Sequence, residues 1–206
     1  MDAAIKNMTA EFEDVKILMN QLSSLKKDER RIKRRLKTKQ LNYTFLSDIV
    51  GLSKKDRKLT EPLFKFFKYL GINVHRAPDN DKGGVEDLRI FYADTLIIIE
   101  ATSIEKGLAT EGKLTQILKH IKIRQAEFPN YKVIGLSIIN HEDNKHFTKR
   151  GIKQKYQDKT VKILKSHELC SVTTLTLLIN FIKIKKGEIT IDDFMRNLTS
   201  PGIYEI

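Results

Sequence analysis

The sequence contains a single cysteine, Cys170. One cysteine excludes an internal disulfide framework and a cysteine-based zinc site, and it is typical of a reducing cytoplasm. Long apolar runs are also missing: the run Leu96–Ile99 ends at Glu100, whereas a membrane span needs about 18 apolar residues. The N-terminus lacks the apolar core of a signal peptide. These absences favour a cytoplasmic protein with no membrane partner.

Several catalytic signatures are absent as well. The pair Gly83-Gly84 precedes an expected strand rather than a helix, so it is neither a P-loop nor a dinucleotide-binding turn. Signatures of serine hydrolases and zinc proteases do not occur. The five histidines are scattered, and a lone histidine is usually structural or on the surface; they are His75, His120, His141, His146 and His167.

What the sequence does have is positive charge. Its 206 residues include 38 Lys and Arg against 26 Asp and Glu, which gives a formal charge of +12. Hydrophobic residues make up 40% of the chain, enough for a folded core. The basic excess favours an anionic partner, with nucleic acid ahead of a membrane surface.

The N-terminal segment differs from the rest of the chain. Apolar residues recur from Ile5 to Leu25 at steps of three and four, which predicts a helix that forms a coiled coil or packs on a partner. We therefore expect a helical region over residues 1–50, with a homodimer or protein partner bound through it, and a second domain over residues 51–206.

The same helix turns strongly basic after Leu25. Residues 26–39 hold nine basic and two acidic side chains, so +7 of the +12 lies in fourteen residues. One interpretation is a helix that follows a phosphate backbone, where each cation displaces a condensed counterion. The other is a solvated face beside a dimer seam, and the two are compatible. The candidate phosphate contacts are Lys26, Lys27, Arg30, Arg31, Lys33, Arg34 and Arg35.

Strands and helices alternate after Gly51, which predicts an α/β fold with a mixed, partly parallel sheet. We expect helices at 60–70, 110–128, 161–167, 175–186 and 191–198, with a loop and helix over 141–157. Strands are expected at 72–75, 85–92, 95–102, 133–139 and 169–173. The run Leu96–Ile99 is apolar on both faces, as in a central strand.

Acidic residues mark the expected hairpin 85–102. Asp87 and Glu100 lie about equally far from its turn at Ala93-Asp94, so they should lie near each other at one end of the sheet. Two close carboxylates repel unless a cation lies between them, and oxygen ligands select Mg²⁺ or Mn²⁺. Alternatively, a strand-end carboxylate caps a helix or pairs with Lys106 or Lys113.

These residues carry a resemblance. Gly84-Val85-Glu86-Asp87-Leu88, an apolar strand, and Ile99-Glu100-Ala101-Thr102-Ser103 resemble the core of the PD-(D/E)XK, or restriction-endonuclease-like, nuclease superfamily. The likeness runs from Lys58 to about Thr173. It implies a central mixed β-sheet flanked by helices and metal-assisted hydrolysis of DNA phosphodiesters. Asp87 and Glu100 would hold Mg²⁺ or Mn²⁺, and Glu61 or Glu86 would complete the shell.

One position departs from this pattern. The superfamily has a lysine two residues after the second acid, where this chain has Thr102. That lysine helps to position and polarise the attacking water. Lys113, on the following helix, is the first candidate to replace it, and Lys106 is the second.

Three functions remain open on this sequence. The first is a metal-dependent endodeoxyribonuclease, in restriction or anti-phage defence. The second is a catalytically degenerate nuclease fold that only binds nucleic acid. The third is an assembly subunit whose N-terminal helix dimerises or docks on a larger ATPase or helicase.

Overall fold

The computed structural model describes residues 44–51, 59–77, 86–105, 111–150 and 158–205, together with Ser24, Lys27, Arg30, Arg31 and Arg34. Within these residues, no helix is both long enough and apolar enough to cross a membrane. The chain forms two compact units, residues 1–44 and 45–206. The division falls after Thr44, the first residue of α2 (Thr44–Ile49), because Phe45 of that helix packs against Phe66 and Phe181 in the core of the second unit.

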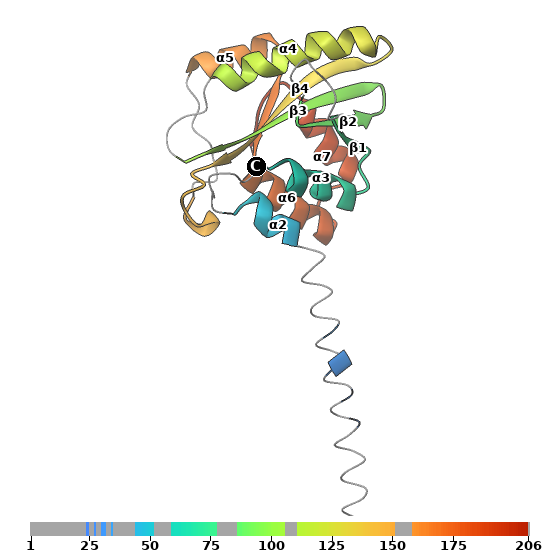
Figure 1. The fold of residues 1–206 in the computed structure, drawn as a ribbon, viewed down its shortest axis with the longest axis vertical. Coiled ribbons are helices and arrows are strands. Elements are labelled where there is room, and N and C mark those ends of the chain that lie inside the picture. Colours follow the sequence, from blue (N-terminus) through green and yellow to red (C-terminus); the bar gives the residue numbers. More distant parts are fainter. Residues whose placement is uncertain are drawn as a thin grey trace, which may run out of the picture. The chain divides into compact units, whose positions relative to one another are not determined.

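The second unit is built on one mixed sheet between two helical layers (Figure 1). The remaining elements are, in chain order, α3 (Thr60–Tyr69), β1 (Val74–Arg76), β2 (Leu88–Tyr92), β3 (Thr95–Ile104), α4 (Glu111–Glu127), β4 (Lys132–His141), the short 3₁₀ helix η1 (Phe147–Lys149), α5 (Asp158–Ser166), β5 (Cys170–Thr173), α6 (Thr174–Lys186), α7 (Ile191–Leu198) and β6 (Gly202–Tyr204).

The strands lie in the sheet in the order in which they occur along the chain. β1, β2 and β3 pair antiparallel, whereas β3 to β6 pair parallel. The α/β class and the mixed sheet predicted from the sequence are therefore confirmed.

Helices cover both faces of the sheet, as Figure 1 shows. Ile97, Ile99 and Leu136 belong to the larger core, which α2, α3, α6 and α7 fill on one face. On the other face, α4 packs with α5 through Leu114, Ile117 and Leu164. Because β3 and β4 are buried on both faces, they carry the apolar runs from which central strands were predicted.

Gly135 of β4 permits a close approach between the sheet and α4. A Cβ at this position would lie 2.3 Å from Cγ2 of Ile117 and 2.7 Å from a methyl carbon of Leu169. No carbon atoms can come so close, so the absence of a side chain here sets how near α4 lies to β4.

β2 begins at Leu88, three residues later than the predicted start at Val85. The reason lies in Asp87, whose carboxylate accepts a hydrogen bond from the backbone N–H of Ala101. The side chain of Asp87 thus occupies a backbone N–H of β3 that would otherwise donate to the backbone of a longer β2. The paired register of the two strands therefore begins only at Leu88. The turn at Ala93-Asp94 is where the sequence predicted it, with Tyr92 paired to Thr95.

Cys170 lies in the core at the start of β5. Burial raises the pKa of its thiol to about 12. The nucleophilic thiolate is therefore scarce at neutral pH, and Cys170 serves as a small apolar core residue.

Candidate active site

Asp87 lies just before β2 and is held there by two hydrogen bonds from different elements. The hydroxyl of Thr60, the first residue of α3, donates to Oδ1 at 3.0 Å. The backbone N–H of Ala101 in β3 donates to Oδ2 at 2.8 Å. The backbone N–H of Asp87 in turn donates to the carbonyl of Ile99. These interactions fix the carboxylate beside the middle of β3.

Glu100 lies next to Asp87 in the register of the hairpin. Leu88 pairs with Ile99, so the residue before Leu88 and the residue after Ile99 are neighbours at the end of the antiparallel pair. The side chain of Glu100 is 3% exposed. Its Oε1 lies 2.9 Å from Nδ1 of His120 in α4, which is itself 2% exposed. The register places the backbones of Asp87 and Glu100 side by side, while the carboxylate of Asp87 meets Thr60 of α3 and that of Glu100 meets His120 of α4.

Glu86 faces α4 and is engaged by two arginines. Arg124 donates from Nε to Oε1 at 3.0 Å and from Nη2 to Oε2 at 3.0 Å. Arg89 places Nη2 2.7 Å from Oε1. All three side chains are buried, and Arg124 also donates to Glu127 at the helix end. Glu86 therefore ties the start of β2 to α4 through a buried ion network.

Glu61 lies in the first turn of α3 and is half-exposed. Its carboxylate accepts a hydrogen bond from Arg76 of β1 and lies 3.4 Å from Nζ of Lys65. Over the described part of the chain, no three His, Cys, Asp or Glu side chains form a group that could hold a metal ion. The structure thus makes neighbours of Asp87 and Glu100, while Glu61 and Glu86 meet basic partners.

Thr102 lies two residues after Glu100 in β3 and is half-buried. Strand alternation puts both residues on the face of the sheet that α4 covers. The backbone of Lys113 lies in the first turn of α4, but its side chain and all of Lys106 lie outside the described residues.

The predicted basic helix is described at only a few positions. Lys27, Arg30, Arg31 and Arg34 are helical and exposed. Lys26, Lys33 and Arg35 lie outside the described residues, as does the apolar stripe from Ile5 to Leu22.

Sequence reasoning missed three residues that position this site: Thr60, His120 and Arg124. Thr60 was only the start of a helix, and His120 was one scattered histidine among five. A signal was nevertheless present, because His120 and Arg124 lie one helical turn apart and border the apolar positions Ile117 and Ile121. Polar side chains on the buried stripe of a helix need polar partners on the element that they face.

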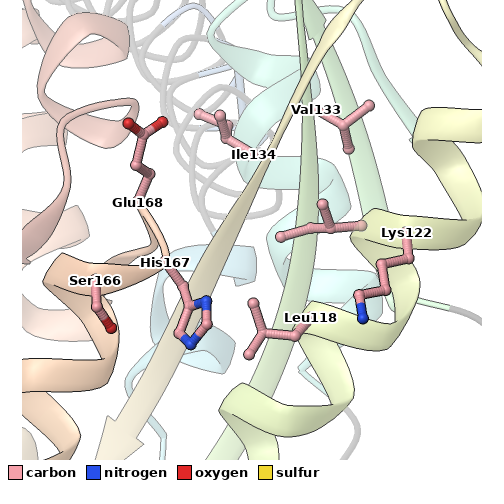
Figure 2. A pocket seen from close by; sticks show the side chains of 8 residues that line it. Leu118, Lys122, Val133, Ile134, Ser166, His167 and Glu168 are labelled. Atoms are coloured by element: carbon pink, nitrogen blue, oxygen red, sulfur yellow. The ribbon is translucent and has the colours of Figure 1, made fainter.

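A cavity of about 390 Å³ lies elsewhere on the same face, among α4, β4 and the turn between α5 and β5 (Figure 2). Its walls are partly apolar, and its one carboxylate, that of Glu168, lies 3.4 Å from Nζ of Lys132. None of the predicted site residues lines it; its lining is Leu118, Ile121, Lys122, Val133, Ile134, Ser166, His167 and Glu168.

No protein-family model and no curated protein sequence matches the chain. Among solved structures, that of the restriction endonuclease FokI is similar with a TM-score of 0.55 and 17% identity, over 78% of this chain. The fold is that of a restriction endonuclease. The match covers 30% of the FokI chain, so this protein spans less than a third of that enzyme's length.

A second restriction endonuclease is also similar to the chain. The small subunit of the heterodimeric restriction endonuclease R.BspD6I matches with a TM-score of 0.48 and 14% identity, over 77% of this chain and 86% of that subunit. It is the FokI match that confirms, at the level of the fold, the resemblance found in Glu86-Asp87, the apolar strand and Glu100.

Proposed function

We propose that this chain is a metal-dependent endonuclease that hydrolyses DNA phosphodiester bonds, with restriction or anti-phage defence as its setting. The observation that carries the proposal is the neighbouring position of Asp87 and Glu100 at the end of the β2–β3 hairpin of a restriction-endonuclease fold. A phosphodiester hydrolase that uses a metal ion needs acidic side chains to bind that ion, and Asp87 and Glu100 would be those side chains here.

The donor chemistry of the pair suits Mg²⁺ or Mn²⁺. Each oxygen of Asp87 accepts one hydrogen bond, from Thr60 or Ala101, and keeps a second lone pair for a cation. Glu100 adds a second carboxylate, so the ligands are hard oxygens. A bound cation would supply Lewis-acid stabilisation of the charge that develops on the phosphate during hydrolysis.

Other residues have supporting roles in the proposal. Thr60 and the N–H of Ala101 fix the orientation of Asp87 before any ligand binds. Glu61 and Glu86 would contact the metal ion through bound water rather than directly, because basic side chains already bind their carboxylates. Lys113 would supply the positive charge that Thr102 lacks. The exposed cations of the N-terminal segment, Lys27 and Arg31 among them, would hold the DNA backbone.

The test is cleavage of supercoiled plasmid by the purified full chain with Mg²⁺ or Mn²⁺. We expect nicking or linearisation, and we expect Asp87→Ala and Glu100→Ala each to lower the rate at least about 100-fold. Asp94→Ala is the matched control, since Asp94 is an acid of the same hairpin but lies at its exposed turn. Cleavage that persists in both site variants would contradict the assignment.

A second function is favoured by one observation, the threonine at position 102. Without a positively charged side chain near the proposed metal site, the protein would bind DNA or serve as an assembly subunit but would not cut DNA. Thr102→Lys separates the two functions: if the chain is an active enzyme, wild type cuts and the variant cuts about tenfold faster or more, because an added cation stabilises the phosphate charge. If wild type binds DNA with no cleavage under either metal ion, the non-catalytic function is correct.

A further inference from the structure

Arg76 is an exposed cation at the end of β1, close to the candidate active site. In the sheet it pairs with Leu88, the residue that follows Asp87. Because β1 and β2 run antiparallel, the end of β1 lies beside the start of β2, where Asp87 is held. The side chain of Arg76 is 53% exposed. Its position therefore brings a guanidinium to the end of the sheet at which Asp87 and Glu100 are neighbours.

Two side chains of α3 hold this guanidinium in place. Its Cζ atom lies 4.2 Å from the centroid of the Phe64 ring, and its Nη2 atom donates a hydrogen bond to Glu61. Glu61 directly follows Thr60, whose hydroxyl donates to Asp87. The residue that binds Arg76 and the residue that binds Asp87 are thus adjacent in α3. Because the ring and the carboxylate already restrict the guanidinium, little freedom is lost when it binds a ligand.

The guanidinium keeps both donors and charge for a ligand. Over the described part of the chain, Nη2 is the one nitrogen atom of Arg76 that makes a hydrogen bond, so Nε and Nη1 remain for a further acceptor. Glu61 also lies 3.4 Å from Nζ of Lys65, so two cations share one carboxylate and one positive charge is left over. A guanidinium with spare N–H groups fits the oxygens of a phosphate.

We propose that Arg76 binds a backbone phosphate of DNA beside Asp87 and Glu100, an inference that rests on the proposed function. Acidic side chains repel a phosphate, and a cation next to them offsets that repulsion. The contact at Arg76 places the DNA strand next to the two carboxylates that would hold the metal ion. Arg76 is therefore a substrate-binding residue of the site and not only a partner of Glu61.

The test compares Arg76→Gln with Lys65→Gln in the full chain. Each variant removes one cationic partner of Glu61, but Lys65 lies one helical turn further along α3. Fluorescence anisotropy with a labelled DNA duplex in EDTA, at several salt concentrations, measures binding without cleavage. We expect Arg76→Gln to weaken binding about tenfold or more, and to make the plot of log affinity against log salt less steep by about 0.9. Lys65→Gln should stay within about threefold of wild type.

Two further measurements separate the possible roles of the guanidinium. Arg76→Lys keeps the charge but loses the planar fork, so we expect the salt dependence of wild type with an affinity at least about threefold lower. Calorimetric titration with Mn²⁺ and no DNA asks whether Arg76 only holds Glu61 for the metal ion. Arg76→Gln should keep its Mn²⁺ affinity within about threefold of wild type.

The outcomes separate this inference from the function on which it rests. Wild-type DNA binding in Arg76→Gln, equal losses in Arg76→Gln and Lys65→Gln, or a parallel loss of Mn²⁺ affinity overturns the role of Arg76 and leaves the nuclease proposal standing. A selective loss of DNA binding in Arg76→Gln, with no cleavage by wild type, supports the phosphate contact and overturns the nuclease proposal. A wild type that neither binds nor cuts DNA overturns both. Thermal unfolding accompanies each measurement, and if Arg76→Gln does not fold, Arg76→Lys decides.

Discussion

Thr60 is a single hydroxyl whose effect should be visible in metal binding. It donates to Oδ1 of Asp87 from the first turn of α3. We expect Thr60→Val, which keeps the shape and removes the donor, to weaken Mn²⁺ binding about tenfold, because Asp87 is then held only by the N–H of Ala101. Thr60→Ser should retain wild-type affinity in a calorimetric titration of the full chain with Mn²⁺. Equal losses in both variants would instead indicate that helix packing, and not the hydroxyl, matters.

Arg124 should be the most sensitive residue for stability on this face. Its removal leaves Glu86 buried with only Arg89 beside it, and breaking a buried ion pair costs about 3–5 kcal/mol. We expect Arg124→Ala to lower the free energy of unfolding by an amount in this range, measured by urea denaturation.

Glu127 provides the control for Arg124. It accepts hydrogen bonds from the same guanidinium, but its side chain is 46% exposed. Glu127→Ala should therefore change stability by no more than about 1 kcal/mol. If Arg124→Ala and Glu127→Ala lowered the free energy of unfolding by similar amounts, the ion pair between Arg124 and Glu86 would contribute little to stability.

The sequence predicts part of the site at the residue scale. Asp87 and Glu100 can be predicted as a pair because strand alternation and one turn are enough to bring them together. The partners of Glu61 and Glu86 cannot, because several cations compete for them and only the packing of α3 against β1, and of α4 against β2, selects Arg76 and Arg124. The pairing of His120 with Glu100 is hidden for the same reason: helix and strand patterns do not determine how two elements dock.

At the scale of elements, long periodic segments are predicted well and short ones are not. The predicted helix 110–128 corresponds to α4 (Glu111–Glu127), and the predicted strand 133–139 to β4, which extends to His141. β6 (Gly202–Tyr204) was missed, and α2 was not separated from the N-terminal helix. Three or six residues hold too little periodicity, and these two elements depend on pairing with β5 and on packing around Phe45.

Two glycines next to or within α4 should respond oppositely to alanine. Gly135→Ala would place a methyl group against Ile117 and Leu169, and such overpacking costs about 1–3 kcal/mol. Gly112 in α4 has no atom within 4 Å of the position of its Cβ, so Gly112→Ala should stabilise by about 0.5–1 kcal/mol through helix propensity. Urea denaturation of both variants measures the two effects.

The expected cost of Gly135→Ala has a consequence for the site. A methyl group that displaces α4 also displaces His120 from Glu100. The variant should therefore lose Mn²⁺ affinity as well as stability, whereas Gly112→Ala should keep its affinity. Loss of stability with unchanged Mn²⁺ binding would show that Leu169, and not α4, moves aside.

At the scale of the whole molecule, the architecture follows from the order of elements. A hairpin around Ala93-Asp94 gives antiparallel pairing, and the helices between later strands give parallel crossovers, so one sheet has to be mixed. What the order cannot supply is the choice of face for each helix. Because β3 and β4 are apolar on both sides, each face of the sheet buries helices: α3 and α6 pack on one face and α4 packs on the other.

The distribution of charge predicts how the protein responds to salt. DNA affinity falls as salt rises, and the steepness of this fall reflects the number of phosphates that the protein neutralises. Replacing four cations together by Gln should make the plot of log affinity against log salt less steep, by about 0.9 for each phosphate that is no longer neutralised. The four are Lys27, Arg30, Arg31 and Arg34. Fluorescence anisotropy with a labelled duplex at several salt concentrations measures the slope. The control replaces Lys183, Lys185 and Lys186 at the end of α6, in the second unit. A larger effect of the control would move the DNA-binding surface to the second unit.

The agreement between strand order and chain order also bears on synthesis. A ribosome releases β2, β3 and α4 before residues 132–141, so the edge of β3 that later pairs with β4 emerges without its partner. That edge carries Leu96–Ile99, apolar on both faces, and an unpaired apolar strand is prone to wrong pairing. The nascent chain is thus most exposed to aggregation in the interval between α4 and β4, which is when a chaperone would protect it most.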